Sequence, residues 1–341
     1  MTTIREIAER VGVSLSTVSA VVNQRGYVSA RMRARIEAAL READYRPHQI
    51  ARSLRLRETR IIGLIVPDLS NSFYSRLMRG AEDYLARAGY RLLVVDSRED
   101  WDRQHDYLVS FSGKMTDGVI LVPCMASNEQ IAAIPNIVRE TPLVYVDRSP
   151  LRCHVDSVLI DNARASYQAT RHLLDLGHRR VAIITEPLNL LNAADRLNGY
   201  KRALQACRIP VDRKLVRMGD NTEDSGYRRG LEVLKLRNRP SAILACNNLM
   251  ALGVLAALRE MDISCPEEAS LVGFDDCEWS AFLEPPLTMV RQPASGLGAA
   301  AAEAILKRVR HPNHNGTEKV LLSTELIVRR STCAPRAKSR R

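Results

Sequence analysis

The sequence predicts a small all-α N-terminal head followed by a larger α/β domain, which is built as two lobes on parallel sheets. In the first 43 residues, apolar side chains recur at helical spacing. From about residue 60 onward, short apolar runs alternate with longer amphipathic stretches. Such strand-then-helix alternation is typical of parallel sheets that helices cover on both faces. Two such series follow one another, so two similar lobes are expected.

The first helix is expected to begin after Thr3. Thr3 and Glu6 have the spacing of a capping box, in which the hydroxyl accepts from a backbone amide and the Glu side chain reaches back. Gly12 then supplies the tight turn that a helix-turn-helix needs between its helices. Between Thr3 and Gly12, four apolar residues recur at helical spacing and form one face of the helix: Ile4, Ile7, Ala8 and Val11.

The second helix is expected to begin after Ser14, which is placed to cap it. Recognition helices meet base edges in the DNA major groove with their N-terminal residues. Leu15 and Ser16, with Ala20 one turn later, are therefore the best candidates to contact bases. The other residues of this motif predicted to contact DNA are Thr3, Ser14, Thr17, Ser19 and Asn23. The pattern would also suit an amphipathic hairpin inside a larger core, with Val18, Val21 and Val22 facing inward.

The distribution of charge favours a DNA-binding head over an amphipathic hairpin inside a larger core. Residues 1–60 contain twelve arginines, no lysine and six acidic residues, a net charge of +6. The residues after Glu325 add six basic side chains and no acid, so the region between is close to neutral. A basic end segment attracts phosphate and makes binding depend on salt. The tail at 331–341 is expected to be a solvated, disordered end.

A third helix is predicted from Ser29 to Ala43, with Ser29 as its cap, and Pro47 prevents its continuation. The segment Ile50 to Leu56 that follows has too few apolar residues to bury a core. An isolated helix of that length is marginal in water, so we expect it to form only on DNA.

The head motifs closely resemble those of the LacI/GalR family of bacterial transcription regulators. The matching stretches are residues 3–23, 28–30, 45–47 and 51–54. The resemblance implies that the segment 50–56 forms a hinge helix in the minor groove, where Leu54 wedges into a base step and kinks the duplex. Its implied DNA contacts are Arg52, Ser53, Leu54 and Arg55. It also implies a homodimer on a near-palindromic operator.

The α/β part is predicted element by element from its pattern. Strands are expected at 61–66, 91–96, 118–122, 144–146, 180–184, 242–246 and 270–274. Helices are expected at 73–88, 103–111, 163–176, 194–207, 225–236 and 249–260. The resemblance implies a periplasmic-binding-protein-like pair of lobes that the chain crosses three times, near Asp161, Arg291 and Leu321.

These crossings define the predicted domains. Residues 1–46 form the DNA-binding domain and 47–60 the hinge helix and linker. Residues 61–161 and 293–320 form the N-lobe, residues 162–292 and 321–330 form the C-lobe, and 331–341 form the basic tail.

A ligand site is expected between the lobes, because open parallel sheets bind ligands at the carboxyl ends of their strands. The candidates at those ends combine aromatic rings, carboxylates, amides and guanidinium groups, which suit a sugar. They are Phe73, Tyr74, Asp96, Asp147, Arg148, Asn192, Arg196, Asn247 and Asp275. Each could instead be a structural cap or an interlobe salt bridge. The resemblance implies that Arg196 and Asp275 contact the effector. Leu190, Asn221 and Thr222 differ from the residues of the family's purine-responding branch. This difference favours a sugar or sugar acid as the effector.

Other functions find little support in the sequence. The run from Gly296 to Ala301 resembles a dinucleotide fingerprint but begins a helix with no strand before it. His311 and His314 have no third metal ligand near them, and no catalytic motif is present. No enzyme activity, cofactor or metal is therefore expected. A two-lobe solute-binding receptor and a sugar-acting α/β enzyme remain the alternatives.

The same features predict where the protein acts and what controls it. No signal peptide or membrane span is recognisable, and the seven cysteines are scattered and odd in number, which favours the cytoplasm. The expected protein is a homodimeric repressor of a carbohydrate-use operon. A sugar or sugar derivative bound between its lobes would alter the pairing of the hinge helices on operator DNA.

Overall fold

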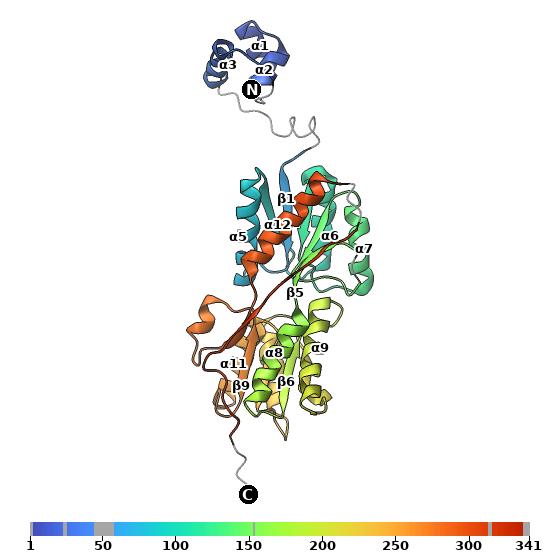
Figure 1. Cartoon of the computed structure of the whole chain (residues 1–341), viewed down its shortest axis with the longest axis vertical. Helices are drawn as coiled ribbons and strands as arrows, with labels where there is room; N and C mark the ends of the chain where they lie inside the picture. The colour runs from blue at the N-terminus through green and yellow to red at the C-terminus, as the bar shows by residue number, and fades with distance from the viewer. Residues whose placement is uncertain (1–2, 23–25, 44–57, 153, 313–315, 337–341) are drawn as a thin grey trace. The chain divides into compact units, whose positions relative to one another are not determined.

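A computed structural model of the chain describes residues 3–22, 26–43, 58–152, 154–312 and 316–336 (Figure 1). The chain divides into two compact units, residues 1–59 and residues 60–341. Among the described residues, no helix is both long enough and apolar enough to cross a membrane.

The first unit is the predicted three-helix head, with α1 (Ile4–Val11), α2 (Leu15–Val22) and α3 (Ala30–Glu42). The capping box of Thr3 and Glu6 is present, and Gly12 ends α1 with a φ of 70°. The three helices pack around a small apolar core, whose buried residues include Ile7, Val18 and Ile36. Ser29 precedes α3, but its side chain makes no capping hydrogen bond, which corrects the predicted cap.

The second unit contains two six-stranded sheets. The first sheet has the order β11-β5-β4-β3-β1-β2. Its strands are β1 (Ile61–Val66), β2 (Arg91–Asp96), β3 (Gly118–Leu121), β4 (Leu143–Val146), β5 (Asp156–Ile160) and β11 (Lys319–Leu322). The second sheet has the order β12-β10-β9-β8-β6-β7. Its strands are β6 (Val181–Thr185), β7 (Val216–Met218), β8 (Ala242–Ala245), β9 (Ser270–Phe274), β10 (Thr288–Arg291) and β12 (Glu325–Ile327).

The two sheets are nearly identical in topology. Every pairing in the first sheet is parallel, and in the second sheet only β12 runs antiparallel, to β10. The chain passes between the sheets after Ile160, after Arg291 and after Leu322. This agrees with the three crossings that the family resemblance implied.

Helices cover both faces of each sheet, as Figure 1 shows. In the first lobe they are α5 (Ser72–Arg87), α6 (Trp101–Ser110), α7 (Asn128–Val138) and α12 (Ala294–Arg310), with a π-helical turn, η1 (Phe111–Met115), after α6. In the second lobe they are α8 (Asn162–Asp175), α9 (Leu191–Ala206), α10 (Glu223–Leu234) and α11 (Asn248–Glu260), with short 3-10 turns η2 (Arg213–Leu215) and η3 (Glu278–Ala281).

The glycine run at the start of α12 serves packing. A Cβ on Gly298 would lie 1.9 Å from the carbonyl oxygen of Leu77 in α5, and a Cβ on Gly80 would lie equally close to that of Ser295. Only glycine permits this approach between α5 and α12. The resemblance to a dinucleotide fingerprint therefore reflects close helix packing.

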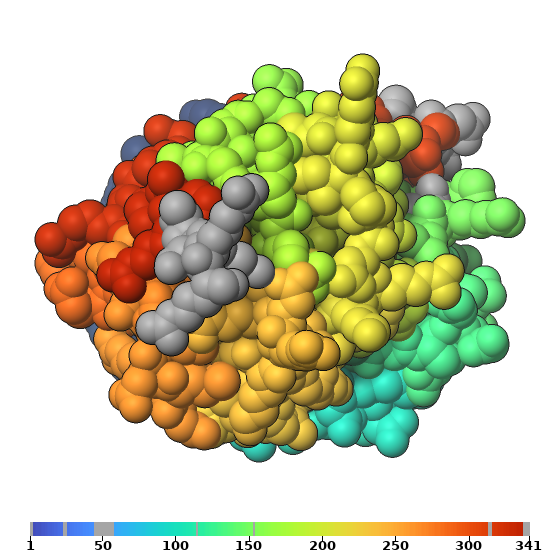
Figure 2. All heavy atoms as spheres, turned by 90° about the horizontal axis from the view of Figure 1, so that it is seen from below, coloured from blue at the N-terminus to red at the C-terminus, as the bar shows by residue number. Residues whose placement is uncertain are grey.

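The C-terminal segment corrects the prediction of a disordered tail for its described part. Ser331 is fully buried, its Oγ accepts from the amide of Thr288 (2.7 Å) and it donates to the carbonyl of Leu271 (2.6 Å). His178 Nε2 lies 2.9 Å from the carbonyl oxygen of Cys333. In Figure 2 the red C-terminal segment accordingly lies between the lime-green and orange parts of the second lobe. The described part of the tail is therefore hydrogen-bonded to the second lobe, which the composition of the tail did not predict.

Candidate functional site

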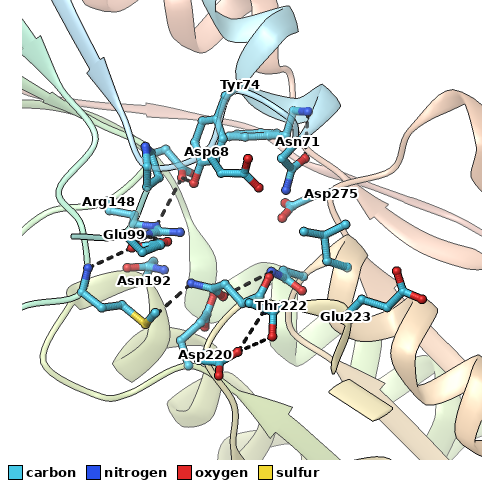
Figure 3. A pocket seen from close by; sticks show the side chains of 18 of the residues that line it. Asp68, Asn71, Tyr74, Glu99, Arg148, Asn192, Asp220, Thr222, Glu223 and Asp275 are labelled. Carbon is cyan, nitrogen blue, oxygen red and sulfur yellow. Dashed lines mark hydrogen bonds and ion pairs between the residues drawn. The ribbon is translucent and has the colours of Figure 1, made fainter. Parts of the chain in front are cut away.

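A cavity of about 520 Å³ lies between the two lobes, at the carboxyl ends of the strands of both sheets (Figure 3). Both lobes contribute to its walls. The lining residues are Pro67, Asp68, Asn71, Phe73, Tyr74, Arg98, Glu99, Met125, Asp147, Arg148, Glu186, Asn192, Arg196, Asp220, Asn221, Thr222, Glu223, Asn247, Leu249 and Asp275. Its size lies within the range of small-molecule sites, roughly 300–1,000 Å³.

Eight of the nine ligand-binding residues predicted from the sequence line this cavity: Phe73, Tyr74, Asp147, Arg148, Asn192, Arg196, Asn247 and Asp275. Asp96 does not. Its carboxylate accepts from the amides of Leu69 (3.3 Å) and Arg98 (2.8 Å), so it shapes the loops beside the cavity. Asn192 and Arg196 lie one turn apart on α9, which begins at Leu191, three residues before the predicted start of this helix.

In the first lobe, an ion pair forms the wall of the cavity. Arg148 Nη1 donates to both carboxylate oxygens of Glu99, at 2.8 and 3.2 Å. Asp147, directly before it, lies 3.9 Å from Arg148 Nε and accepts from the Tyr74 hydroxyl at 3.5 Å. The Phe73 and Tyr74 rings meet edge to face, with centroids 5.1 Å apart. This lobe therefore offers the cavity an aromatic edge, a carboxylate and an ion pair.

In the second lobe, Arg196 is held from several sides. Its Nε donates to Asn162 Oδ1 at 2.8 Å, and its Nη1 pairs with Glu186 Oε1 at 3.1 Å. Nη1 also donates to the carbonyl of Cys246. The guanidinium lies 4.4 Å from the centroid of the Phe274 ring, within cation–π distance. The side chain is almost completely buried, so its position is set before any ligand arrives.

Two of the four aspartates that line the cavity share an unusual backbone conformation. Asp147 follows β4 with a φ of 65°, and Asp275 follows β9 with a φ of 67°. A left-handed backbone outside glycine stores strain and is frequent at functional sites. Burial raises the pKa of Asp147 to about 6, and burial also raises the pKa of Asp275. Gln292 Nε2 donates to Asp275 from below the cavity.

Direct contacts also join the lobes around the cavity. The amides of Asn71 and Asn248 donate to each other's oxygens, at 3.1 and 3.0 Å. Arg76 Nη2 donates to the carbonyl of Asp276 at 2.6 Å. These bonds hold one arrangement of the lobes and would have to adjust if the lobes moved.

Sequence reasoning missed Glu99, Glu186 and Asn221 among the cavity residues. Glu186 directly follows β6, and Glu99 follows β2 by three positions, so their place at strand ends was the available signal. The predicted strand ended at residue 184, one residue before β6 ends, so Glu186 did not stand directly after it. In the amide orientation that suits both neighbours, Asn221 accepts from Arg148 Nη2 (3.1 Å) and donates to Glu186 Oε1 (3.2 Å).

The head presents the predicted DNA-contacting face at the start of α2. Leu15 is 49% exposed and Ser16 is also exposed, whereas Ser19 and Ala20 are half-buried. The Ser14 hydroxyl accepts from the amide of Thr17 at 3.2 Å, as a cap should. The sequence analysis did not single out Tyr27, which is 96% exposed between α2 and α3. Five predicted DNA contacts lie outside the described residues: Asn23, Arg52, Ser53, Leu54 and Arg55.

Comparison with known proteins assigns the chain to a family. Residues 3–48 match the model of bacterial regulatory proteins of the lacI family, and residues 170–332 match the periplasmic binding protein-like domain. The chain is 32% identical to the HTH-type transcriptional repressor PurR of Vibrio atlanticus, over 97% of this chain and 98% of the relative. It is 33% identical to the ribose operon repressor of Haemophilus influenzae, over 95% and 97%.

Solved structures agree. The Lac repressor dimer bound to operator and the anti-inducer ONPF superposes with a TM-score of 0.86 and 27% identity, covering 98% of this chain and 99% of that one. The match includes both the head and the two-lobe domain. The chain therefore belongs to the LacI family of bacterial regulatory proteins, and it is a ligand-responsive, DNA-binding transcriptional repressor rather than an enzyme.

Proposed function

We propose that the protein is a homodimeric repressor of a carbohydrate-use operon and that its effector is a sugar or sugar derivative bound in the cavity between the lobes. The observation that carries this proposal is the chemistry of the cavity walls. Tyr74 and Phe73 provide aromatic surface, and Asp147, Asp275 and Asn247 provide hydrogen-bonding groups. Carboxylate and amide groups converging beside aromatic rings suit the hydroxyls and apolar face of a sugar ring.

A nucleobase is the competing effector, because several similar relatives are repressors named PurR. Binding of a flat heterocycle is favoured by aromatic or apolar surface against both of its faces. Apart from Leu249, the second lobe lines the cavity with polar side chains, among them Asn192, Arg196, Asn221, Thr222 and Asn247. This lining favours a ligand with hydroxyls on several sides.

The proposed mechanism uses the hinge to connect the cavity with DNA. Residues 1–46 would read a half-site, and residues 47–60 would form the hinge helix and linker. Residues 61–161 with 293–320, and 162–292 with 321–330, would be the lobes that the effector brings together. An effector can shift this equilibrium only by its difference in affinity for the two states.

Two further features of the proposal concern assembly and location. The Lac repressor in the matched structure is a dimer bound to operator, and we propose the same assembly for this chain. Two heads in a dimer would read two half-sites of a near-palindrome. Binding to operator DNA places the proposed site of action in the cytoplasm.

The proposal can be tested by a mobility-shift titration of the full-length protein on genomic fragments from its own operon and on scrambled fragments of equal length. We expect specific binding that is at least tenfold tighter and that a sugar changes. Equal binding to both DNAs at every salt concentration would contradict the regulator. Specific binding that responds only to nucleobases would contradict the carbohydrate effector.

A second test addresses the hinge. Leu54→Ala should weaken specific binding and leave nonspecific binding nearly unchanged, because a wedge acts only when the duplex is kinked. Leu15→Ala is the matched control on the base-reading face, where losses should depend on the base pair contacted. Equal losses of specific and nonspecific binding in Leu54→Ala would remove the wedge from the mechanism.

A further inference from the structure

The interior of the cavity carries more carboxylates than cations. Its inner wall holds the carboxylates Glu99, Asp147, Glu186 and Asp275 and the guanidinium groups Arg148 and Arg196. Asp68, Asp220, Glu223 and Arg98 line the same cavity, so the excess of acid extends over the whole lining. A net negative charge is costly to keep out of water, and a bound cation would relieve the cost.

Neither inner guanidinium is free to neutralise a ligand. Arg148 is bound by both oxygens of Glu99, and Arg196 is bound by Glu186 and by two further acceptors. The chain's own carboxylates thus already match both cations. An anionic ligand, such as a sugar acid or a sugar phosphate, would meet no unpaired positive charge on this wall.

Two of the four inner-wall carboxylates, Asp147 and Asp275, have no arginine at hydrogen-bond distance within the described part of the chain. Asp147 comes from the first lobe and has the Tyr74 hydroxyl at 3.5 Å, with Arg148 Nε at 3.9 Å. Asp275 comes from the second lobe and binds the neutral amide of Gln292. Burial is the main cause of the raised pKa of both carboxyls, and the charge of Asp275 adds to the elevation of the pKa at Asp147. Both side chains line the same cavity, so a single ligand bound there can lie beside both carboxylates.

An unpartnered acceptor lines the same space. Asn192 is 4% exposed, and its Oδ1 has no hydrogen-bond partner among the described residues. Figure 3 shows Asn192 in the cavity wall near Glu99. A buried acceptor without a donor is uncommon in folded proteins and suggests that a ligand supplies the donor.

We infer that the effector carries a protonated amine, as an amino sugar or a similar hydroxylated amine does, and that this amine binds the carboxylates of Asp147 and Asp275 from opposite lobes. An ammonium group has three hydrogen-bond donors and no acceptor, so it can donate to two carboxylates and to the Asn192 oxygen. By bridging the lobes it would also draw them together. The inference rests on the proposed carbohydrate effector and specifies its charge.

The experiment compares ligands that differ only in charge. The full-length protein would be titrated at neutral pH with glucosamine, galactosamine and mannosamine. Each amine is matched with its parent hexose, its N-acetyl derivative and the corresponding aldonic acid. Thermal shift identifies the binding series, and calorimetry gives the dissociation constants. We expect at least one amine to bind roughly ten- to a hundredfold more tightly than its parent and its N-acetyl form.

Amide variants identify the groups responsible. Asp147→Asn and Asp275→Asn keep the shape of the side chain, and asparagine tolerates the left-handed backbone at both positions. Each variant should lose the preference for the amine by about tenfold or more while still unfolding in a single cooperative thermal transition. Glu303→Gln, an exposed carboxylate-to-amide change on α12, is the matched control and should keep the preference.

Each outcome decides between the two proposals. If neutral hexoses or aldonic acids bind as tightly as the amines, the inference is overturned and the carbohydrate effector stands. If the amide variants keep the full preference for the amine, the assignment to Asp147 and Asp275 is overturned. If no compound of any charge binds or alters operator affinity, the inference and the carbohydrate effector both fail.

Discussion

The two lobes supply the cavity with the same parts but hold them differently. Each provides an arginine paired with a glutamate and an aspartate with a left-handed backbone at a strand end. In the second lobe, Arg196 contacts a carboxylate, an amide oxygen, a carbonyl and an aromatic ring. In the first lobe, the Arg148 pair is more open, because the Glu99 side chain is 21% exposed and the Glu186 side chain only 6%.

This difference indicates that the two halves of the binding site differ in rigidity. A group whose position is fixed by its own lobe costs little to order when a ligand binds. The second lobe therefore provides the rigid half of the cavity, and the first lobe provides the half that adjusts. Since the N-lobe is the one that directly follows the linker in sequence, adjustments there are the ones expected to reach the DNA-binding head.

The largest expected effect comes from removing the arginine of the rigid half. Arg196→Ala leaves the Glu186 carboxylate buried without a partner and should lower the free energy of unfolding by about 3–5 kcal/mol. Arg148→Ala should cost clearly less, because Glu99 can turn toward water. Urea denaturation of both variants measures the comparison. Equal losses would show that the two pairs are held alike.

A second effect concerns pH and the aspartate of the first lobe. The pKa of Asp147 rises from about 3.8 to about 6 because the carboxyl is buried. Folded protein therefore holds a proton that unfolded protein has released between these values, so stability should fall as pH rises through this window. Four neighbouring charges also shift the pKa of Asp147, so they are left unchanged in the variants compared: Arg148, Asp275, Arg196 and Glu186.

Asp147→Asn removes this titration. The variant should be more stable than the unmodified protein at neutral pH, by up to about 3 kcal/mol, and the two should converge near pH 4. Denaturation at a series of pH values tests the sign. A variant that is less stable than the parent protein at neutral pH would mean that the charged carboxylate stabilises the empty cavity.

A third effect tests the edge of the second lobe. Ser331→Ala leaves the buried amide of Thr288 without its acceptor, so we expect a loss of about 1–3 kcal/mol. Ser323→Ala, a change of an exposed serine between β11 and β12, is the control. If Ser331→Ala unfolds at the same denaturant concentration as the control, the C-terminal segment does not support that lobe.

The smallest effect concerns the contacts between the lobes. Arg76→Ala removes the hydrogen bond to the carbonyl of Asp276 and should change the free energy of the observed lobe arrangement by about 1 kcal/mol. That change corresponds to a several-fold change in effector affinity. Calorimetry with the effector measures it. Unaltered affinity would indicate that this bond is present in both arrangements of the lobes.

The sequence by itself determined the head, the alternation of strands and helices, and most of the strand-end residues of the cavity. These follow from local rules, since caps, helical periodicity and buried runs depend on neighbouring residues. Thr3 with Glu6 and the run from Ile61 to Val66 are found as predicted. Short elements escaped, among them β7 with three residues, because so brief a segment has no periodicity to detect.

Only the tertiary structure decided which polar groups are left for a ligand. The sequence indicated Arg196 as a ligand contact, but its partners Asn162, Glu186 and Cys246 come from separate elements. Likewise Asp96 stands at a strand end like Asp147, yet it binds loop amides. Pairing between groups distant in the chain depends on how the elements pack, so the excess of carboxylates in the cavity became visible only in three dimensions.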